Sequence, residues 1–304
     1  MCQATLNSQE EEEKMAIKVV NLSMRENRYF ASVDGGQEFL VGKRVTYKTR
    51  VGLAGGFDKN DPKYNPEDYA KYHHWRYLIE PTAYCESKYS FTCINTYDRA
   101  KFTFGFMQYA AHVAEGDFVE FFRRLLNIPT GKDYFPDLVL DSGRICKVSG
   151  EALVPLETSV SSEALMDYLN PSSAEVENVE AVNSAKFIHW TFTEKASRDI
   201  QVEVAVSLFK SYMKAFAKKY GLNGCRDDVC LAVCDIRHQG RGTSGEILQA
   251  LQTEGNQDKA FQNLAQIGAE AYPSRCKDLQ DAVERLRKNG LLGNRTFNVT
   301  SQDF

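Results

Sequence analysis

The sequence predicts an α+β fold that is mainly α-helical, with a small β-sheet and a β-rich N-terminal segment. Short β-prone runs bounded by turn residues occur before residue 56. After residue 67, apolar residues instead recur at spacings of three and four. The 304 residues, 43% hydrophobic and 26% charged, are typical of a globular protein that buries its core without needing a disulfide or a metal.

The first third of the chain divides into three segments. Residues 1–15 are polar and end in a run of glutamates, which predicts a disordered, solvated leader. Residues 16–55 contain four short β-prone pieces with an Asp-Gly-Gly turn signal at 34–36, which predicts a small antiparallel sheet. The stretch 53–66 is rich in Gly, Asp, Asn and Pro and predicts a loop, so we expect the main domain to span residues 56–304.

Helical periodicity predicts most of the later elements. Asp117 can cap a helix that presents an apolar face and closes at Pro129. An Asp-Ser-Gly turn predicts a hairpin over residues 138–148, and Ser172 with Glu175 has capping-box spacing ahead of a further helix. The remaining predicted elements are a long helix through Val202 and Tyr220 that ends at Gly221, a buried helix over 227–238 that Gly240 stops, one capped by Ser244, and one capped by Ser274 that ends at Gly290.

Charge and hydropathy exclude several classes of partner. The net charge of -4 provides no basic field, so neither nucleic acid nor an anionic membrane is expected as a partner. No apolar run is long enough to insert into a membrane, and the N-terminus lacks the pattern of a signal peptide. We therefore expect the protein to be cytoplasmic as made. A dedicated secretion system or lysis would have to release it if it acts outside the cell, and any export or immunity partner is left unspecified.

The most informative segment is residues 84–108, YCESKYSFTCINTYDRAKFTFGFMQ. It places Glu86 at an expected helix end among aromatic side chains, and Asp98 on a polar loop before a β-prone piece. Glycosidic cleavage needs two carboxyl groups in such unlike surroundings. An apolar pocket raises the pKa of one so that it can donate a proton, and a wetter site keeps the other ionised. The segment predicts Glu86 as the acid, with Glu80 as the alternative.

The order of these residues resembles the lysozyme-like superfamily of lysozymes and transglycosylases. The resemblance consists of a Glu-Ser pair at a helix end, a short β-prone excursion, and a Thr-x-Gly-x-x-Gln stretch formed by Thr103, Gly105 and Gln108. The run from Asp98 to Thr103 is also similar to the Asp-Gly-Arg-Gly-Tyr-Thr segment of the family 46 chitosanases within that superfamily. The resemblance implies a two-lobed, lysozyme-like catalytic domain over residues 56–304, with the small sheet at its cleft.

The chitosanase-like segment implies a role for each residue. Glu86 is the general acid, Asp98 activates water, and Thr103 helps to hold that water, in an inverting mechanism. Asp235, on the predicted buried helix, corresponds to a structural or cleft-wall residue. The residues expected to bind substrate are Tyr84, Tyr97, Arg99 and Gln108.

The resulting hypothesis is an endo-acting glycosidase that cleaves β-1,4 bonds of an amino-sugar polysaccharide. Bacterial peptidoglycan is the first substrate hypothesis, which makes the protein a lysozyme that degrades cell walls, and chitosan is the second. No cofactor is expected. The alternative from another class is a non-catalytic protein that binds a glycan or a protein partner on a lysozyme-like scaffold.

The cysteines suggest two competing sites. Cys230, Cys234 and His238 recur every fourth residue, a spacing that can build one side of a zinc site. The same spacing is typical of a buried helix, and with no second cysteine pair we expect core rather than metal. Cys85 and Cys93 are close enough in sequence for a disulfide to close a short loop; otherwise we expect reduced, mostly buried thiols.

Overall fold

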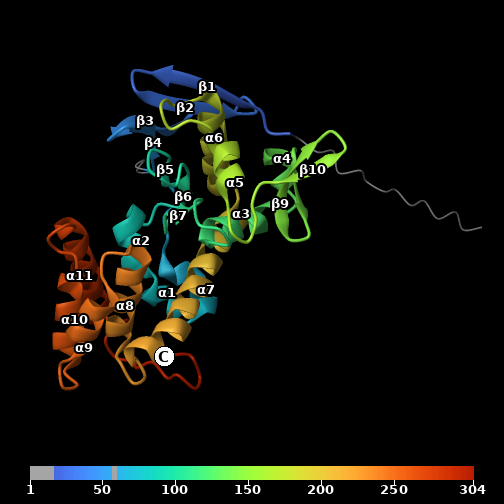
Figure 1. The fold of residues 1–304 in the computed structure, drawn as a ribbon. Coiled ribbons are helices and arrows are strands. Elements are labelled where there is room, and N and C mark those ends of the chain that lie inside the picture. The colour runs from blue at the N-terminus through green and yellow to red at the C-terminus, as the bar shows by residue number, and fades with distance from the viewer. Residues whose placement is uncertain (1–16, 57–59) are drawn as a thin grey trace, which may run out of the picture.

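One antiparallel sheet runs from the N-terminal segment into the centre of the molecule (Figure 1). The computed structural model describes residues 17–56 and 60–304, so the predicted leader lies outside the described residues. Within them, neighbouring strands pair in sequence order, each antiparallel to the next. The strands are β1 (Val20–Arg25), β2 (Arg28–Val33), β3 (Phe39–Tyr47), β4 (Arg50–Gly55), β5 (Ile94–Asn95), β6 (Thr103–Phe104) and β7 (Tyr109–Ala110).

The β-rich N-terminal segment is continuous with the strands that follow Glu86. Ala54 and Gly55 at the end of β4 pair with Asn95 and Ile94 of β5. A side chain at Gly55 would not fit, because its Cβ would stand 2.4 Å from the carbonyl oxygen of Val41 on β3. The sheet therefore connects the segment outside the family resemblance directly to the segment that contains the predicted catalytic residues.

A smaller sheet confirms the hairpin predicted over residues 138–148. In the described part of the chain it has the strand order β10-β9-β8. Its turn follows the prediction, because Ser142 and Gly143 both adopt positive φ angles between β8 and β9. The strands are β8 (Leu138–Asp141), β9 (Arg144–Ser149) and β10 (Ala152–Pro155).

Helix α6 packs against β1, β2 and β3, and the final four helices cluster at the end of the molecule opposite β1 and β2 (Figure 1). Together with the antiparallel sheets they confirm the predicted α+β class. Across the described ranges, no helix is both long and apolar enough to cross a membrane. The helices are η1 (Pro66–Tyr72), α1 (Trp75–Leu78), α2 (Glu80–Ser87), α3 (Asp117–Leu126), α4 (Gly131–Tyr134), α5 (Glu163–Leu169), α6 (Asn178–Thr193), α7 (Lys195–Tyr220), α8 (Asp227–Gln239), α9 (Ser244–Leu251), α10 (Gln257–Gln266) and α11 (Pro273–Lys288).

Several predicted helix ends are confirmed. Gly221 and Gly240 end α7 and α8 in the left-handed conformation, which glycine adopts without steric cost. Helix α3 buries its phenylalanines as expected, but Gly116 rather than Asp117 is its N-cap, and Asp117 is the first helical residue. These phenylalanines pack around Phe187 of α6, which lies 5.3 Å from Phe104 of β6 between ring centroids. The core therefore lies directly behind the strands that follow Asp98.

Three other predicted helix starts are wrong by one or more residues. The Ser172 hydroxyl accepts a hydrogen bond from the amide of Ala174, in a local turn, and helix α6 begins only at Asn178. Thr243 rather than Ser244 caps α9, in a reciprocal capping box with Glu246. Helix α11 begins at Pro273, ahead of Ser274, because proline is well suited to the first helical position.

Candidate functional site

Glu86 lies in the last turn of α2, and the residue after it ties the helix end to the sheet. The Ser87 hydroxyl donates a hydrogen bond to the carbonyl of Phe106 (2.8 Å), in the turn between β6 and β7. That turn needs Gly105, whose φ is 89° and whose Cα approaches Gln201 too closely for a side chain. The Glu-Ser pair and the Thr-x-Gly-x-x-Gln stretch, separate in sequence, are thus joined in one structural unit.

Glu86 faces two basic residues from the C-terminal helices. Its Oε1 forms an ion pair with Nη2 of Arg275 on α11, at 2.8 Å. Nε2 of His238 on α8 lies 3.7 Å from the same oxygen. His238 Nε2 is also 3.3 Å from the carbonyl oxygen of Met107. The Glu86 side chain is 16% exposed, so a ligand from solvent can reach it.

Glu80, the alternative acid, is occupied by other partners. Its Oε1 accepts hydrogen bonds from the hydroxyl of Tyr89 (3.0 Å) and from Arg285 (2.6 Å). The residue is only 3% exposed. Oε1 thus ties Glu80 to α11, while Oε2 is buried with no hydrogen-bond partner among the described residues.

A buried charge network stands behind Glu86. Asp235 of α8 is fully buried and pairs with Arg241 (2.5 Å) and Arg275 (2.9 Å). Burial by itself would raise the pKa of Asp235, but the two guanidinium groups outweigh it and the pKa is lowered. Asp235 is therefore ionised at neutral pH, and Arg275 shares its positive charge between Asp235 and Glu86.

Sequence reasoning missed most of this network. Asp235 was expected to be structural or a cleft-wall residue, and its buried ion pairs are compatible with that role. No sequence pattern points to Arg275, since it lies 189 positions after Glu86 on an ordinary amphipathic helix. The spacing of His238 from Cys230 and Cys234 suggests a metal ligand and gives no sign of a contact with Glu86. In the structure His238 contacts Glu86.

Asp98 and Thr103 lie on the hairpin formed by β5 and β6. Both oxygens of Asp98 are held within its own loop, Oδ1 by the amide of Ala100 (2.8 Å) and Oδ2 by the Asn95 side chain (3.1 Å). The carboxylate is partly exposed. Thr103 is buried on β6, and its hydroxyl has no hydrogen-bond partner among the described residues. The Thr103 hydroxyl is therefore a buried polar group without a partner in the described part of the chain.

The four expected substrate-binding residues are found in different settings. Tyr84 is half-buried on α2, beneath the ammonium of Lys88 at 3.8 Å, and Tyr97 packs beside Tyr47 of β3. Arg99 is exposed. The pKa of His112 is lowered, first by the burial of His112 and second by the positive charge of Arg99. Gln108 donates from Nε2 to the carbonyls of Cys93 and Gly105, so this amide nitrogen shapes the turn. No contact joins all four side chains within the described ranges.

Buried side chains clamp the loop that contains Asp98. Glu180 of α6 is fully buried, and its Oε1 accepts hydrogen bonds from the Thr96 hydroxyl and from the amide of Leu53 (3.1 Å). Asn170 donates to the carbonyls of Thr96 (3.2 Å) and Lys101 (2.9 Å). The loop is thereby anchored on both sides of Asp98. Burial raises the pKa of Glu180 to about 7.

The described cysteines, including Cys85 and Cys93, are free thiols. Cys230 and Cys234 are buried in α8, and burial raises the pKa of both thiols. The described residues contain no group of three or more His, Cys, Asp or Glu side chains arranged to hold a metal ion. Since thiolate is the reactive and metal-binding form, these two side chains are suited to the core.

Comparisons with known proteins identify no relative. No protein-family model, curated protein or solved structure matches the chain. The functional assignment therefore depends on the geometry of the site itself.

Removing the buried charge at position 235 should destabilise the protein. In Asp235→Asn the guanidinium of Arg241 remains buried without a counter-ion, so we expect a loss of about 3 kcal/mol in the free energy of unfolding at pH 7. The pKa of Asp235 is lowered in the fold, so this stabilisation is present above about pH 4 and decreases as pH falls below it. Urea unfolding at pH 7 and pH 3 measures both effects.

The matched control is Asp281→Asn. Asp281 is 58% exposed and pairs with Lys277 on the surface of α11, so its loss should leave stability nearly unchanged. A loss below about 1 kcal/mol for Asp235→Asn at pH 7 would contradict the proposed role of the buried pair.

Glu180 should make stability depend on pH in a defined window. Its pKa rises from an ordinary 4.5 to about 7 on folding, so the unfolded chain ionises first and stability falls as pH rises between these values. Glu180→Gln lacks this titration. Relative to the wild type, it should gain up to about 3 kcal/mol in unfolding free energy between pH 4.5 and pH 7.5.

Urea unfolding of both proteins across this range tests the expectation. Glu175→Gln, at an exposed glutamate ahead of α6, is the control and should follow the wild-type curve. Parallel pH curves for the wild type and Glu180→Gln would show that Glu180 does not titrate in this range.

Proposed function

We propose that the protein is a glycoside hydrolase with a lysozyme-like catalytic domain, in which Glu86 is the general acid and Asp98 activates water. The supporting observation is the unit formed by the α2 end and the β5–β7 strands. Ser87 joins Glu86 to the turn after β6, and the loop before β6 presents Asp98. Glycosidic cleavage requires two carboxyl groups that flank the scissile bond, and Glu86 and Asp98 are the proposed pair.

The proposed acid, Glu86, is held by a cation and not in the apolar pocket that its sequence context predicts. Arg275 pairs with Oε1 and thereby orients the carboxyl group. Asp235 neutralises part of the charge of Arg275. The protein therefore positions Glu86 with a cation whose charge is already shared, rather than with an isolated arginine.

Asp98 and Thr103 supply the other half of the mechanism. The hydrogen bonds from Ala100 and Asn95 hold the carboxyl group of Asp98 in its loop, where it would accept a proton from water. The unpartnered hydroxyl of Thr103, on the following strand, can orient that water. Attack by this water on the face opposite the leaving group inverts the anomeric centre.

The proposed substrate is a β-1,4-linked amino-sugar polysaccharide cleaved within the chain. Peptidoglycan is the first substrate, which makes the protein a lysozyme, and chitosan is the second. The similarity of the Asp98–Thr103 run to chitosanases favours chitosan as the alternative. A non-catalytic glycan- or partner-binding protein is the remaining hypothesis, and the following experiment separates it from an enzyme.

Glu86→Gln should remove activity without unfolding the protein. An amide cannot donate the proton that the leaving oxygen needs, so we expect turnover to fall by about 10² to 10⁴. Gel assays with embedded peptidoglycan or chitosan measure the loss, and the melting temperature should change little because glutamine can still accept the bond from Arg275.

Glu284→Gln, at an exposed glutamate on α11, is the control and should retain full activity. If Glu86→Gln keeps a tenth or more of the wild-type rate, the acid lies elsewhere. If the wild type clears neither polymer, the binding hypothesis is favoured.

The stereochemistry of the product tests the role of Asp98. A water must fit between the carboxyl groups of an inverting enzyme, which should stand roughly 6.5 to 9.5 Å apart in the substrate complex. We expect the first-formed reducing end to be inverted, as NMR of a fresh digest measures. Thr103→Ala should lower turnover and leave substrate affinity nearly unchanged, because the hydroxyl orients water rather than sugar. A retained anomer, or a glycosyl group trapped on Asp98, would exclude the water-activating role.

A further inference from the structure

The N-terminal part of the large sheet has one face covered by α6 and one face exposed to solvent. Ala31 of β2 is only 1% exposed and pairs with Phe39 of β3. The ring of Phe39 lies 5.9 Å from that of His189 on α6, between ring centroids. Side chains alternate between the two faces of a strand, so Arg28, three residues before Ala31, lies on the solvent face.

Three cations stand side by side on this solvent face. Arg25, Arg28 and Lys43 are paired in register across β1, β2 and β3, and all three are exposed. Residues that oppose each other directly in an antiparallel sheet share a face, with Cβ atoms roughly 5 Å apart, and like charges at such positions are destabilising. The row therefore lowers the stability of the fold, and an anionic ligand would relieve the repulsion.

The chain offers this row little compensating charge. Residues 17–56 contain seven lysines and arginines and three acidic residues, a net charge of +4 in a chain whose total is -4. Arg25 pairs with Glu38, whereas Arg28 and Lys43 form no ion pair with any described residue. Two adjacent cations thus remain available to a ligand.

The same face extends to the turn between β3 and β4. Tyr47 lies four residues after Lys43 on β3 and so shares its face, and it pairs in register with Arg50 of β4. Tyr47 is 54% exposed, and its ring lies 6.3 Å from that of Tyr97, between ring centroids. We call this surface the basic face and define it by Arg25, Arg28, Lys43, Tyr47 and Arg50.

The row of paired residues continues toward the proposed catalytic loop. Lys43 pairs with Ala54 of β4, and Ala54 pairs with Asn95 of β5. The side chain of Asn95 donates to the carboxyl group of Asp98 (3.1 Å). The basic face is therefore on the same side of the sheet as Asn95, and two strand spacings, roughly 10 Å, separate Lys43 from it.

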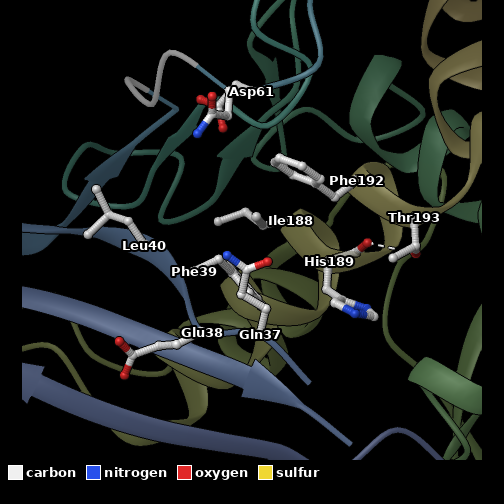
Figure 2. A pocket seen from close by; sticks show the side chains of 10 residues that line it. Gln37, Glu38, Phe39, Leu40, Asp61, Ile188, His189, Phe192 and Thr193 are labelled. Atoms are coloured by element: carbon white, nitrogen blue, oxygen red, sulfur yellow. Dashed lines mark hydrogen bonds between the residues drawn. The ribbon is translucent and has the colours of Figure 1, made fainter. Parts of the chain in front are cut away.

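The basic face is distinct from a pocket of about 390 Å³ between the start of β3 and the C-terminal half of α6 (Figure 2). Gln37, Phe39 and His189 are among the described residues that line this pocket, and no residue of the basic face is. A ligand on the basic face would thus lie outside the pocket.

We propose that the basic face binds the carboxylates of the peptide branches on a peptidoglycan strand, while the sugar chain of the same strand lies at Glu86 and Asp98. The choice of a glycan rests on the proposed function, and charge then selects between its two substrates. Peptidoglycan has lactyl-peptide carboxylates that the basic face attracts, whereas chitosan is a polyamine that it repels. The exposed ring of Tyr47 adds an apolar contact for the strand.

Binding to insoluble peptidoglycan tests the proposal, on a Glu86→Gln background that prevents cleavage. The wall is first treated with hydrofluoric acid, which removes phosphate polymers, and binding is measured by co-sedimentation. Arg28→Gln combined with Lys43→Gln should raise the apparent Kd about two- to thirtyfold, the range expected for the loss of two exposed ion pairs. The melting temperature should stay the same or rise, because two opposed like charges are removed.

Two variants and one modified ligand are the controls. Lys214→Gln combined with Lys218→Gln removes two exposed lysines of α7, outside the sheet, and should leave the Kd unchanged. Arg28→Lys combined with Lys43→Arg keeps both charges and should bind as the wild type does. Coupling the carboxyl groups of the wall to ethanolamine removes their charge, so the wild type should then bind as weakly as the double glutamine variant.

The outcomes separate the basic face from the active site. Unchanged wall binding by the double glutamine variant would overturn the proposal even if the wild type clears peptidoglycan. Loss of binding in the charge-keeping variant, or tighter Arg28-dependent binding to DNA or to phosphatidylglycerol vesicles than to the wall, would also overturn it. Charge-dependent wall binding by a protein that cleaves neither polymer would support the basic face and reject the proposed hydrolase.

Discussion

The candidate site depends most on the buried ion pairs of Asp235. It pairs with Arg241 after α8 and with Arg275 of α11, and thereby fixes two segments 34 positions apart in the sequence around one charge. Arg275 in turn reaches Glu86 at the end of α2. A buried ion pair is costly when one partner is missing, so this network constrains the relative positions of all three helices. The orientation of Glu86 is a consequence of that constraint.

A second buried carboxyl group, that of Glu180, holds the loop that contains Asp98. Glu180 reaches from α6 to the backbone of Leu53 and the side chain of Thr96, and Asn170 holds the same loop from its other end. The loop with Asp98 is thus fixed by helices that lie far from it in sequence. The two halves of the proposed mechanism are each held by buried polar groups rather than by apolar packing alone. This arrangement limits the movement of either carboxylate and makes their separation a property of the fold.

The continuous sheet gives the N-terminal segment a role in this arrangement. Strand β4 pairs with β5, so β1–β4 extend the sheet that contains the proposed catalytic loop. The same segment supplies Gln37 and Phe39 to the pocket on α6 (Figure 2). The N-terminal strands thus pair with the strand before the Asp98 loop and also line the pocket on α6.

The sequence by itself determined the local structure and the candidate acid. Periodicity and glycine placement predicted the α+β class, the 138–148 hairpin and the ends of α7 and α8, because these depend on backbone preferences within a few residues. Motif order singled out Glu86. The exact starts of α6, α9 and α11 were not predictable, since neighbouring polar residues compete for the same cap and tertiary contacts choose between them.

Only the tertiary structure decided what surrounds Glu86 and Asp98. Arg275 and Glu180 are ordinary charged residues on amphipathic or mixed helices, and their importance arises from burial beside partners at least 40 positions away. Periodicity reports which face of a helix is apolar, but it does not report which helices meet. Long-range pairing depends on the packing of the whole chain, and the pocket between β3 and α6 is another product of that packing.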